Sequence, residues 1–132
     1  MLRYLLDTNV VVALLRGPAE DLNRRLRQHE PAEVGVSSIS MHELYYGACR
    51  SERTEHNLAL VDGMLLQVVD FDSDDARESG AIRADLAARG TPIGPYDILI
   101  AGQARGRGLT LVTANTAEFQ RVPDLAMEDW TS

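Results

Sequence analysis

A chain of 132 residues, 45% hydrophobic and 25% charged, holds enough apolar material for one core, so we expect one globular domain over residues 1–132. Its formal charge of -7 disfavours broad non-specific nucleic-acid binding, and the lack of lysine excludes lysine-dependent chemistry. The single cysteine excludes an intramolecular disulfide and a multi-cysteine metal site. A reducing, cytoplasmic setting is expected, since no apolar run approaches a signal core or a membrane span.

Short β-rich runs alternate with longer helical patterns along the whole chain. Such alternation favours an α/β fold with a mainly parallel sheet. We predict strands at residues 3–6, 33–37, 67–71, 109–113 and 125–128. The expected architecture is therefore a five-stranded sheet flanked by helices.

The segments between these strands are predicted to be helices. Their expected ranges are 9–15, 18–29, 38–51, 54–67, 72–90 and 95–108. Pro18 and Pro95 suit the first turns of their helices, and Gly90 is a reasonable stop. In the fourth segment the spacing of Leu58, Val61 and Leu65 predicts that all three face the core.

Polar residues interrupt apolar segments at four corresponding places, where strands end and helices begin. Asp7 follows the first strand, and Glu43 and Asp97 lie in the first turns of later helices. Asn115 and Glu118 come just after the fourth strand. Because the carboxyl ends of parallel strands meet at one edge of a sheet, we expect these side chains to gather in one crevice.

Taken singly, each of these residues also suits an ordinary role at a helix start. An N-cap, a capping box or a favourable interaction with the helix dipole would each account for one of them. The candidates for such roles are Asp7 or Thr8, the pairs Ser40–Glu43 and Asn115–Glu118, and Asp97. Both interpretations stay open at the level of the residues alone.

Three converging carboxylates, Asp7, Glu43 and Asp97, need either protons or a cation. At an effective dielectric near 20, two carboxylates about 4 Å apart repel by roughly 4 kcal/mol. Oxygen ligands without cysteine or a histidine pair suit a hard ion, Mg²⁺ or Mn²⁺. The three histidines form no zinc-type spacing.

Four motifs in one order resemble those of the PIN-domain ribonucleases, and most closely the VapC-type toxins of bacterial toxin–antitoxin pairs. They are YLLDTN, SSISMHELYYGA, PYDILIAGQA and LVTANTAEFQRVPDLAMEDW. Because they span nearly the whole chain, the resemblance is far more specific than any single acidic motif. It implies a compact α/β/α domain, an acidic metal site and endoribonuclease activity restrained by an antitoxin.

The resemblance also implies roles for individual residues. Asp7, Glu43 and Asp97 match the three acidic positions of the family. Thr8 and Asn9 complete the first motif, and Thr113 matches the small hydroxyl residue of the last motif. Where many PIN domains carry Asp this chain has Asn115, so Glu118 is the candidate replacement and a second metal site is in doubt.

The expected reaction is metal-assisted hydrolysis of an RNA phosphodiester. Asp7 and Asp97 would hold the Mg²⁺, while Glu43 would orient or deprotonate the attacking water. The expected partner is a cognate antitoxin whose basic segment meets the acidic crevice. By analogy, a homodimer and a larger toxin–antitoxin assembly are also expected.

Arginines near the crevice would help to bind RNA, but the two arginine clusters of the sequence also suit ordinary structural roles. Arg24, Arg25 and Arg27 lie on an amphipathic segment and suit a solvated helix face. Arg105 and Arg107, at a helix end, suit interaction with the helix dipole.

There are three alternative functional classes, and the sequence argues against the first two. A phospho-accepting receiver domain needs a lysine that this chain lacks, and a DxD phosphatase needs an Asp where Asn9 stands. A catalytically silent PIN domain that only binds other proteins stays open, although the three retained carboxylates argue against it.

Overall fold

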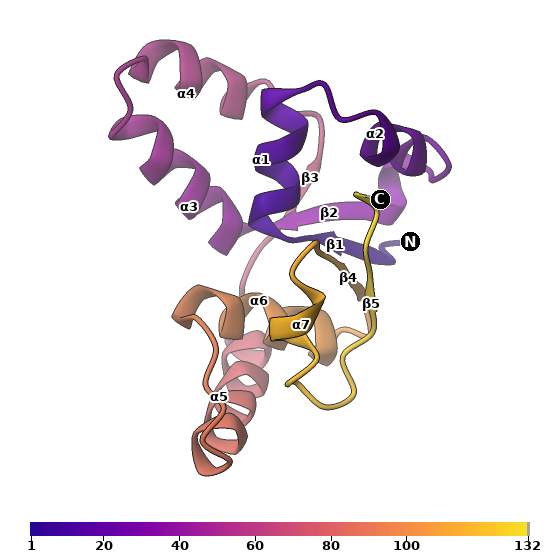
Figure 1. Cartoon of the computed structure of the whole chain (residues 1–132), viewed down its shortest axis with the longest axis vertical. Helices are drawn as coiled ribbons and strands as arrows, with labels where there is room; N and C mark the ends of the chain where they lie inside the picture. The colour runs from indigo at the N-terminus through magenta and orange to yellow at the C-terminus, as the bar shows by residue number, and fades with distance from the viewer. Residues whose placement is uncertain (132) are drawn as a thin grey trace.

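The computed structural model describes residues 1–131, and its centre is a sheet of five short parallel strands (Figure 1). The strands are β1 (Tyr4–Leu6), β2 (Val34–Ser37), β3 (Gln67–Val69), β4 (Thr110–Val112) and β5 (Met127–Glu128). Their order across the sheet is β3-β2-β1-β4-β5, and every neighbouring pair runs parallel. All five predicted strands are confirmed, each somewhat shorter than expected.

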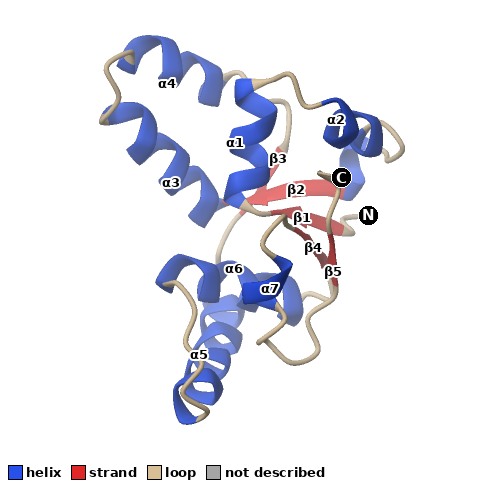
Figure 2. Ribbon diagram, viewed as in Figure 1, coloured by secondary structure: helices blue, strands red, loops and turns tan. Residues whose placement is uncertain are grey.

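Helices cover both faces of the sheet, as Figure 2 shows. One group comprises α1 (Thr8–Arg16), α2 (Glu20–Leu26), α3 (Ser38–Cys49) and α4 (Thr54–Asp62). The other comprises α5 (Ser73–Ala88), α6 (Pro95–Gly106) and the short α7 (Thr116–Phe119). A 3-10 turn, η1 (Pro31–Glu33), leads into β2. No helix in residues 1–131 is long and apolar enough to cross a membrane.

Strand β1 separates two hydrophobic cores, which explains why it is apolar at every position. Leu5 packs into the core beneath α5 and α6, which contains Ile82 and Ile100. Its neighbours Tyr4 and Leu6 point to the opposite face and join the core built around α1. Alternate residues of a strand project to opposite faces, so a central strand covered by helices on both sides has no position for a polar residue until it ends.

Several expectations about the helices are wrong. Helix α2 begins at Glu20, so Pro18 precedes it and does not lie in its first turn. Helix α4 ends at Asp62, so Leu65 lies beyond it and is 98% exposed, whereas Val61 is 5% exposed. Helix α3 is capped by Ser37, whose hydroxyl accepts a hydrogen bond from the Ile39 amide. Ser40 therefore lies inside the helix, and the capping box expected for Ser40 and Glu43 does not form.

Helices α5 and α6 pack closely because Gly102 faces Ser79. An ideal Cβ at Gly102 would lie 2.5 Å from the Ser79 Cβ and 2.6 Å from its Cα. Glycine at this position thus lets the two backbones approach each other. Pro95 opens α6 and Gly90, with a φ of +68°, follows α5, as the sequence predicts.

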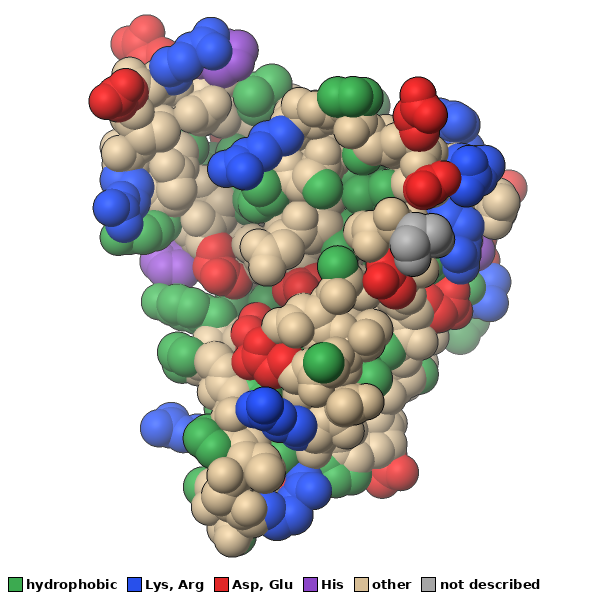
Figure 3. Space-filling view, in the orientation of Figure 1, with side chains coloured by type: hydrophobic (Ala, Val, Ile, Leu, Met, Phe, Trp, Pro, Cys, Tyr) green, Lys and Arg blue, Asp and Glu red, His purple; other side chains and the backbone are tan. Residues whose placement is uncertain are grey.

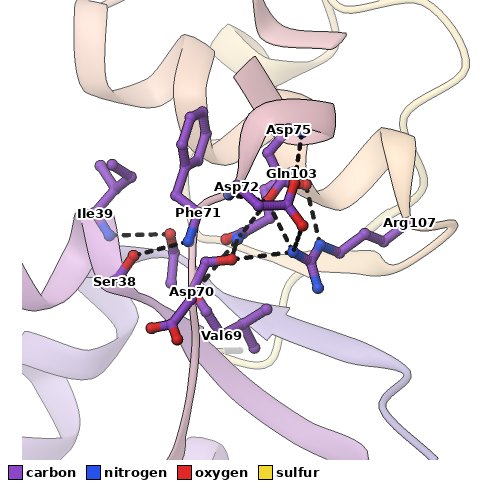
Figure 4. Close-up of polar contacts among 10 residues, drawn as sticks. Ser38, Ile39, Val69, Asp70, Phe71, Asp72, Asp75, Gln103 and Arg107 are labelled. Carbon is purple, nitrogen blue, oxygen red and sulfur yellow. Dashed lines mark hydrogen bonds and ion pairs between the residues drawn. The ribbon is translucent and has the colours of Figure 1, made fainter. Parts of the chain in front are cut away.

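A buried polar network holds α6 against the connection between β3 and α5 (Figure 4). Arg107 donates two hydrogen bonds to Asp75, of 2.8 and 3.0 Å, and one to the Asp70 carbonyl. The Gln103 amide donates to the same Asp75 carboxylate and to the Val69 and Asp70 carbonyls. Arg107 therefore does more than the expected interaction with the helix dipole, because it neutralises a carboxylate that is only 2% exposed.

Candidate active site

Asp7 lies at the carboxyl end of the central strand, where it is 3% exposed. Its Oδ1 accepts a 2.8 Å hydrogen bond from the Thr8 amide, and its Oδ2 accepts one of 2.9 Å from the Thr113 hydroxyl. Asp7 is also the N-cap of α1, so the capping interpretation and the site interpretation apply to the same side chain. The polar residue interrupts the apolar run at the point where strand β1 stops and α1 begins.

Glu43 is tied to the start of α1 through a hydroxyl group. The Thr8 hydroxyl donates a 2.8 Å hydrogen bond to Glu43 Oε1. The same hydroxyl oxygen lies 2.8 Å from that of Ser40, which is completely buried. Because a hydroxyl has one proton, Thr8 donates to the carboxylate and accepts from Ser40 in return. This chain of hydroxyls fixes Glu43 relative to Asp7.

Asp97 and Glu118 form the other side of the site. Glu118 Oε1 accepts a 3.0 Å hydrogen bond from the Gly94 amide, and its Oε2 accepts a short one from the Asn115 side chain. An ideal Cβ at Gly94 would lie 3.0 Å from Asp97 Oδ2 and 3.9 Å from Glu118 Oε1. The loop before α6 thus passes directly beside both carboxylates.

The four carboxylates influence one another electrostatically. Burial is the largest cause that raises the pKa of Asp97 to about 7, and the negative charges of Asp7, Glu118 and Glu43 add to it. Burial likewise raises the pKa of Asp7, and the hydrogen bonds from Thr113 and Thr8 offset part of that shift. Ionising all four carboxyl groups at once is therefore unfavourable unless a cation is present.

The structure brings most of the predicted site residues together. Asp7 comes directly after β1 and Asp97 from the first turn of α6, as expected. Glu43 lies in the second turn of α3, so its expected place in the first turn is wrong. Thr113 and Thr8 contact these carboxylates directly, and Asn115 reaches them through Glu118 and through its backbone amide, which donates to the Thr113 hydroxyl. Asn9 lies exposed on the first turn of α1.

Two contributors were missed from the sequence. Ser40 was considered only as a helix cap, yet its buried hydroxyl supports Thr8 and so Glu43. Gly94 carries no side chain, and its amide holds Glu118. The spacing of Ser40 one turn before Glu43 on the same helix was a usable signal for the first, whereas nothing in the sequence marks a backbone donor.

The donor set suits a hard cation, although no tight ligand cage is formed. Within residues 1–131, no three His, Cys, Asp or Glu side chains are close enough to hold a metal ion on their own. Mg²⁺ characteristically keeps several water ligands and binds through one or two carboxylates. Acidic side chains gather across the middle of one face of the molecule, where such an ion could reach them (Figure 3).

Comparison with known proteins identifies the family of this chain. The family model of the PIN domain matches residues 4–125. The chain therefore belongs to the PIN domain family, whose nucleases depend in general on a divalent metal ion.

Full-length relatives narrow the class. The tRNA(fMet)-specific endonuclease VapC of Salmonella typhimurium is 44% identical, with 98% of this chain and 99% of the relative aligned. Within the family, the chain falls among the VapC-type ribonucleases of toxin–antitoxin systems.

Solved structures give the same result. DNA-bound VapBC from Salmonella typhimurium superposes with a TM-score of 0.94 at 44% identity, covering 98% of this chain and 99% of that one. VapBC2 from Rickettsia felis, bound to a DNA fragment from its promoter, has a TM-score of 0.90 at 34% identity and the same coverage. The α/β fold predicted from the sequence is thereby confirmed.

Proposed function

We propose that residues 1–132 form one PIN domain that acts as a toxin endoribonuclease in the cytoplasm, with its active site at the acidic crevice. The observation that carries this proposal is the electrostatic effect of the fixed Asp7 carboxylate on Asp97. Asp7 is fixed by two hydrogen bonds at the end of the central strand, and its charge helps to raise the pKa of Asp97 to about 7. Carboxylates that disfavour each other's charge are typical of a site that takes up a cation.

We assign Asp7 and Asp97 as the residues that would hold the metal ion, Mg²⁺ or Mn²⁺, directly or through water. Glu118 stands beside Asp97 and is an auxiliary candidate, with Asn115 positioning it. Once bound, the ion would lower the pKa of a coordinated water and offset charge on the phosphate.

Glu43 suits the role of the group that takes a proton from the attacking water. Thr8 holds its Oε1, and Oε2 accepts no hydrogen bond from the described part of the chain. Water would add to phosphorus as the bond from phosphorus to the 3′ oxygen breaks, and that oxygen would take up a proton. The products would be a 5′-phosphate and a 3′-hydroxyl.

The first substrate to examine is initiator tRNA, because a relative 44% identical is named for its specificity toward tRNA(fMet). The test is to incubate the purified protein with initiator tRNA, elongator tRNAs and Mg²⁺ and to map the 5′ ends produced. Cleavage that requires Mg²⁺, leaves 5′-phosphates and disappears in Asp7→Asn supports the proposal. Equal cleavage by Asp7→Asn would reject the assigned site.

The proposed partner is a cognate antitoxin, since several similar structures are VapBC complexes. A basic antitoxin segment would place a guanidinium or ammonium group against Asp7, Glu43 or Asp97, where the metal would otherwise bind. A homodimer within a larger toxin–antitoxin assembly is part of the same proposal. Replacing the basic residues of that segment with Ala should release RNA cleavage; inhibition that survives unchanged would show that the site is blocked by other means.

A further inference from the structure

A cleft leads away from the acidic site between α1, α3 and α4. Thr8 and Glu43 line it at the site itself, and Arg16, Arg53 and His56 line its remaining wall. Of the described residues that line the cleft, Glu43 alone is acidic. A basic wall connected to the carboxylates is unusual in a chain whose formal charge is -7.

The two arginines of this cleft are free to bind a ligand. Six other arginines form ion pairs with carboxylates of the chain: Arg3, Arg24, Arg25, Arg89, Arg105 and Arg107. Neither Arg16 nor Arg53 has such a partner within the described residues, and both are exposed. A guanidinium without an internal partner can form bidentate hydrogen bonds to a phosphate.

We propose that this cleft holds the RNA strand next to the scissile phosphate, with Arg16 and Arg53 binding backbone phosphates. The cleft is continuous with the active site because Glu43 lines both. An RNA positioned for cleavage at the carboxylates must leave the site along one of its walls, and this cleft provides such a path. In the view of Figures 1 and 3, helices α1, α3 and α4 form the upper part of the molecule. Basic side chains there lie above the acidic side chains in the middle of the same face.

The rest of the cleft suits the sugars and bases of a single strand. Leu60, 40% exposed, and the partly buried Val12 add apolar surface to the lining of the same cleft. Phosphate contacts fix the register of a nucleic acid without reading its sequence. The two arginines would thus supply affinity and orientation, and the chemistry would stay with the carboxylates.

The inference rests on the proposed cleavage site, and the experiment separates the two. Binding of a short fluorescein-labelled single-stranded RNA is measured by anisotropy in EDTA, where cleavage cannot occur, over a range of salt concentrations. Variants are Arg16→Ala/Arg53→Ala, the charge-retaining Arg16→Lys/Arg53→Lys, and the control Arg77→Ala, an exposed arginine on α5. Melting temperatures establish that each variant is folded.

The double alanine variant should bind more weakly and lower the slope of log affinity against log salt by about 1.4, or about 0.7 per lost phosphate contact on a single strand. The lysine variant should keep most of the slope, and Arg77→Ala should leave it unchanged. With Mg²⁺ present, the alanine variant should raise KM and leave kcat nearly unaltered.

Two results would overturn the inference. An unchanged slope would show that RNA does not follow this cleft, even if every variant cleaves. Unchanged RNA affinity together with a weakened antitoxin complex would show that the cleft receives protein. If the wild-type protein binds RNA through the two arginines but does not cleave it with Mg²⁺ present, the result would count against the proposed active site and not against the RNA-binding cleft.

Discussion

The Thr113 hydroxyl donates a 2.9 Å hydrogen bond to Asp7 Oδ2, joining residues that are 106 positions apart in the chain. The contact is possible because β1 and β4 are parallel neighbours, with Leu6 opposite Val112, so that the next residue of each strand reaches the same edge. The buried Asp7 carboxylate is thus held by one donor that follows β4 and one donor at the start of α1. Its charge is nevertheless disfavoured, since burial raises its pKa.

Replacing Asp7 with Asn should abolish cleavage without unfolding the protein. The amide oxygen can still accept from the Thr8 amide, and removing the charge relieves repulsion within the cluster. Thermal melting in EDTA should give an unchanged or higher midpoint. A clear loss of metal-free stability would mean that Asp7 is mainly a helix cap.

Replacing Glu43 with Gln should separate positioning from catalysis. Glutamine can accept the same hydrogen bond from Thr8, so the stability of the protein should hardly change. Loss of a general base typically costs about 10²- to 10⁴-fold in rate. Single-turnover cleavage measures this directly, and a rate near that of the wild type would exclude the proposed role.

Metal-free stability should depend on Asp97 between mildly acidic and neutral pH. Burial first, and the charge of Asp7 next, raise the pKa of Asp97 from 3.8 to about 7 in the folded protein. The folded state therefore holds this proton more tightly than the unfolded state. The resulting stabilisation is complete below pH 3.8 and is lost as the pH rises through about 7.

Denaturant unfolding in EDTA across this range checks the dependence. Asp97→Asn should flatten the decline in stability, whereas Asp74→Asn, at an exposed carboxylate on α5, should leave the decline in place. Identical pH profiles for wild type and Asp97→Asn would show that the cluster does not perturb this carboxyl group.

Substituting Gly102 with Ala should destabilise the protein by about 1–3 kcal/mol, the usual cost of overpacking. The added methyl group would meet the Ser79 backbone, which cannot move aside as a flexible side chain could. Gly80→Ala is the matched control, because nothing lies within 4 Å of its ideal Cβ and alanine favours a helix. Chemical unfolding should show opposite signs for the two variants; equal effects would refute the close-packing account.

The residues best predicted from the sequence are those governed by local order along the chain. Asp7 follows a strand and Asp97 lies in the first turn of a helix, so a parallel sheet alone brings these two to one edge. Glu43 reaches the same edge from the second turn of α3, one turn later than expected. The packing of Leu65 was mispredicted because helical spacing does not say where a helix stops. The partner of Arg107 was invisible because Asp75 lies 32 residues away on another helix.

Contacts made by hydroxyl and backbone groups also could not be predicted from the sequence. Thr8, Ser40 and Glu43 come together only when α1 and α3 pack side by side, and a capping box was an equally good account of Ser40 beforehand. The amide of Gly94 has no residue-specific signal at all. Local patterns thus located the carboxylates, and tertiary packing determined what holds them.

Calorimetric titration of Mn²⁺ into the metal-free protein tests most directly whether the acidic crevice is a metal site. The wild-type protein should bind Mn²⁺, and Asp74→Asn should bind it equally well. Asp7→Asn should lose most of that binding, because it removes the carboxylate fixed by Thr8 and Thr113 at the end of β1. Mn²⁺ binding of equal affinity and stoichiometry in wild type and Asp7→Asn would contradict the account.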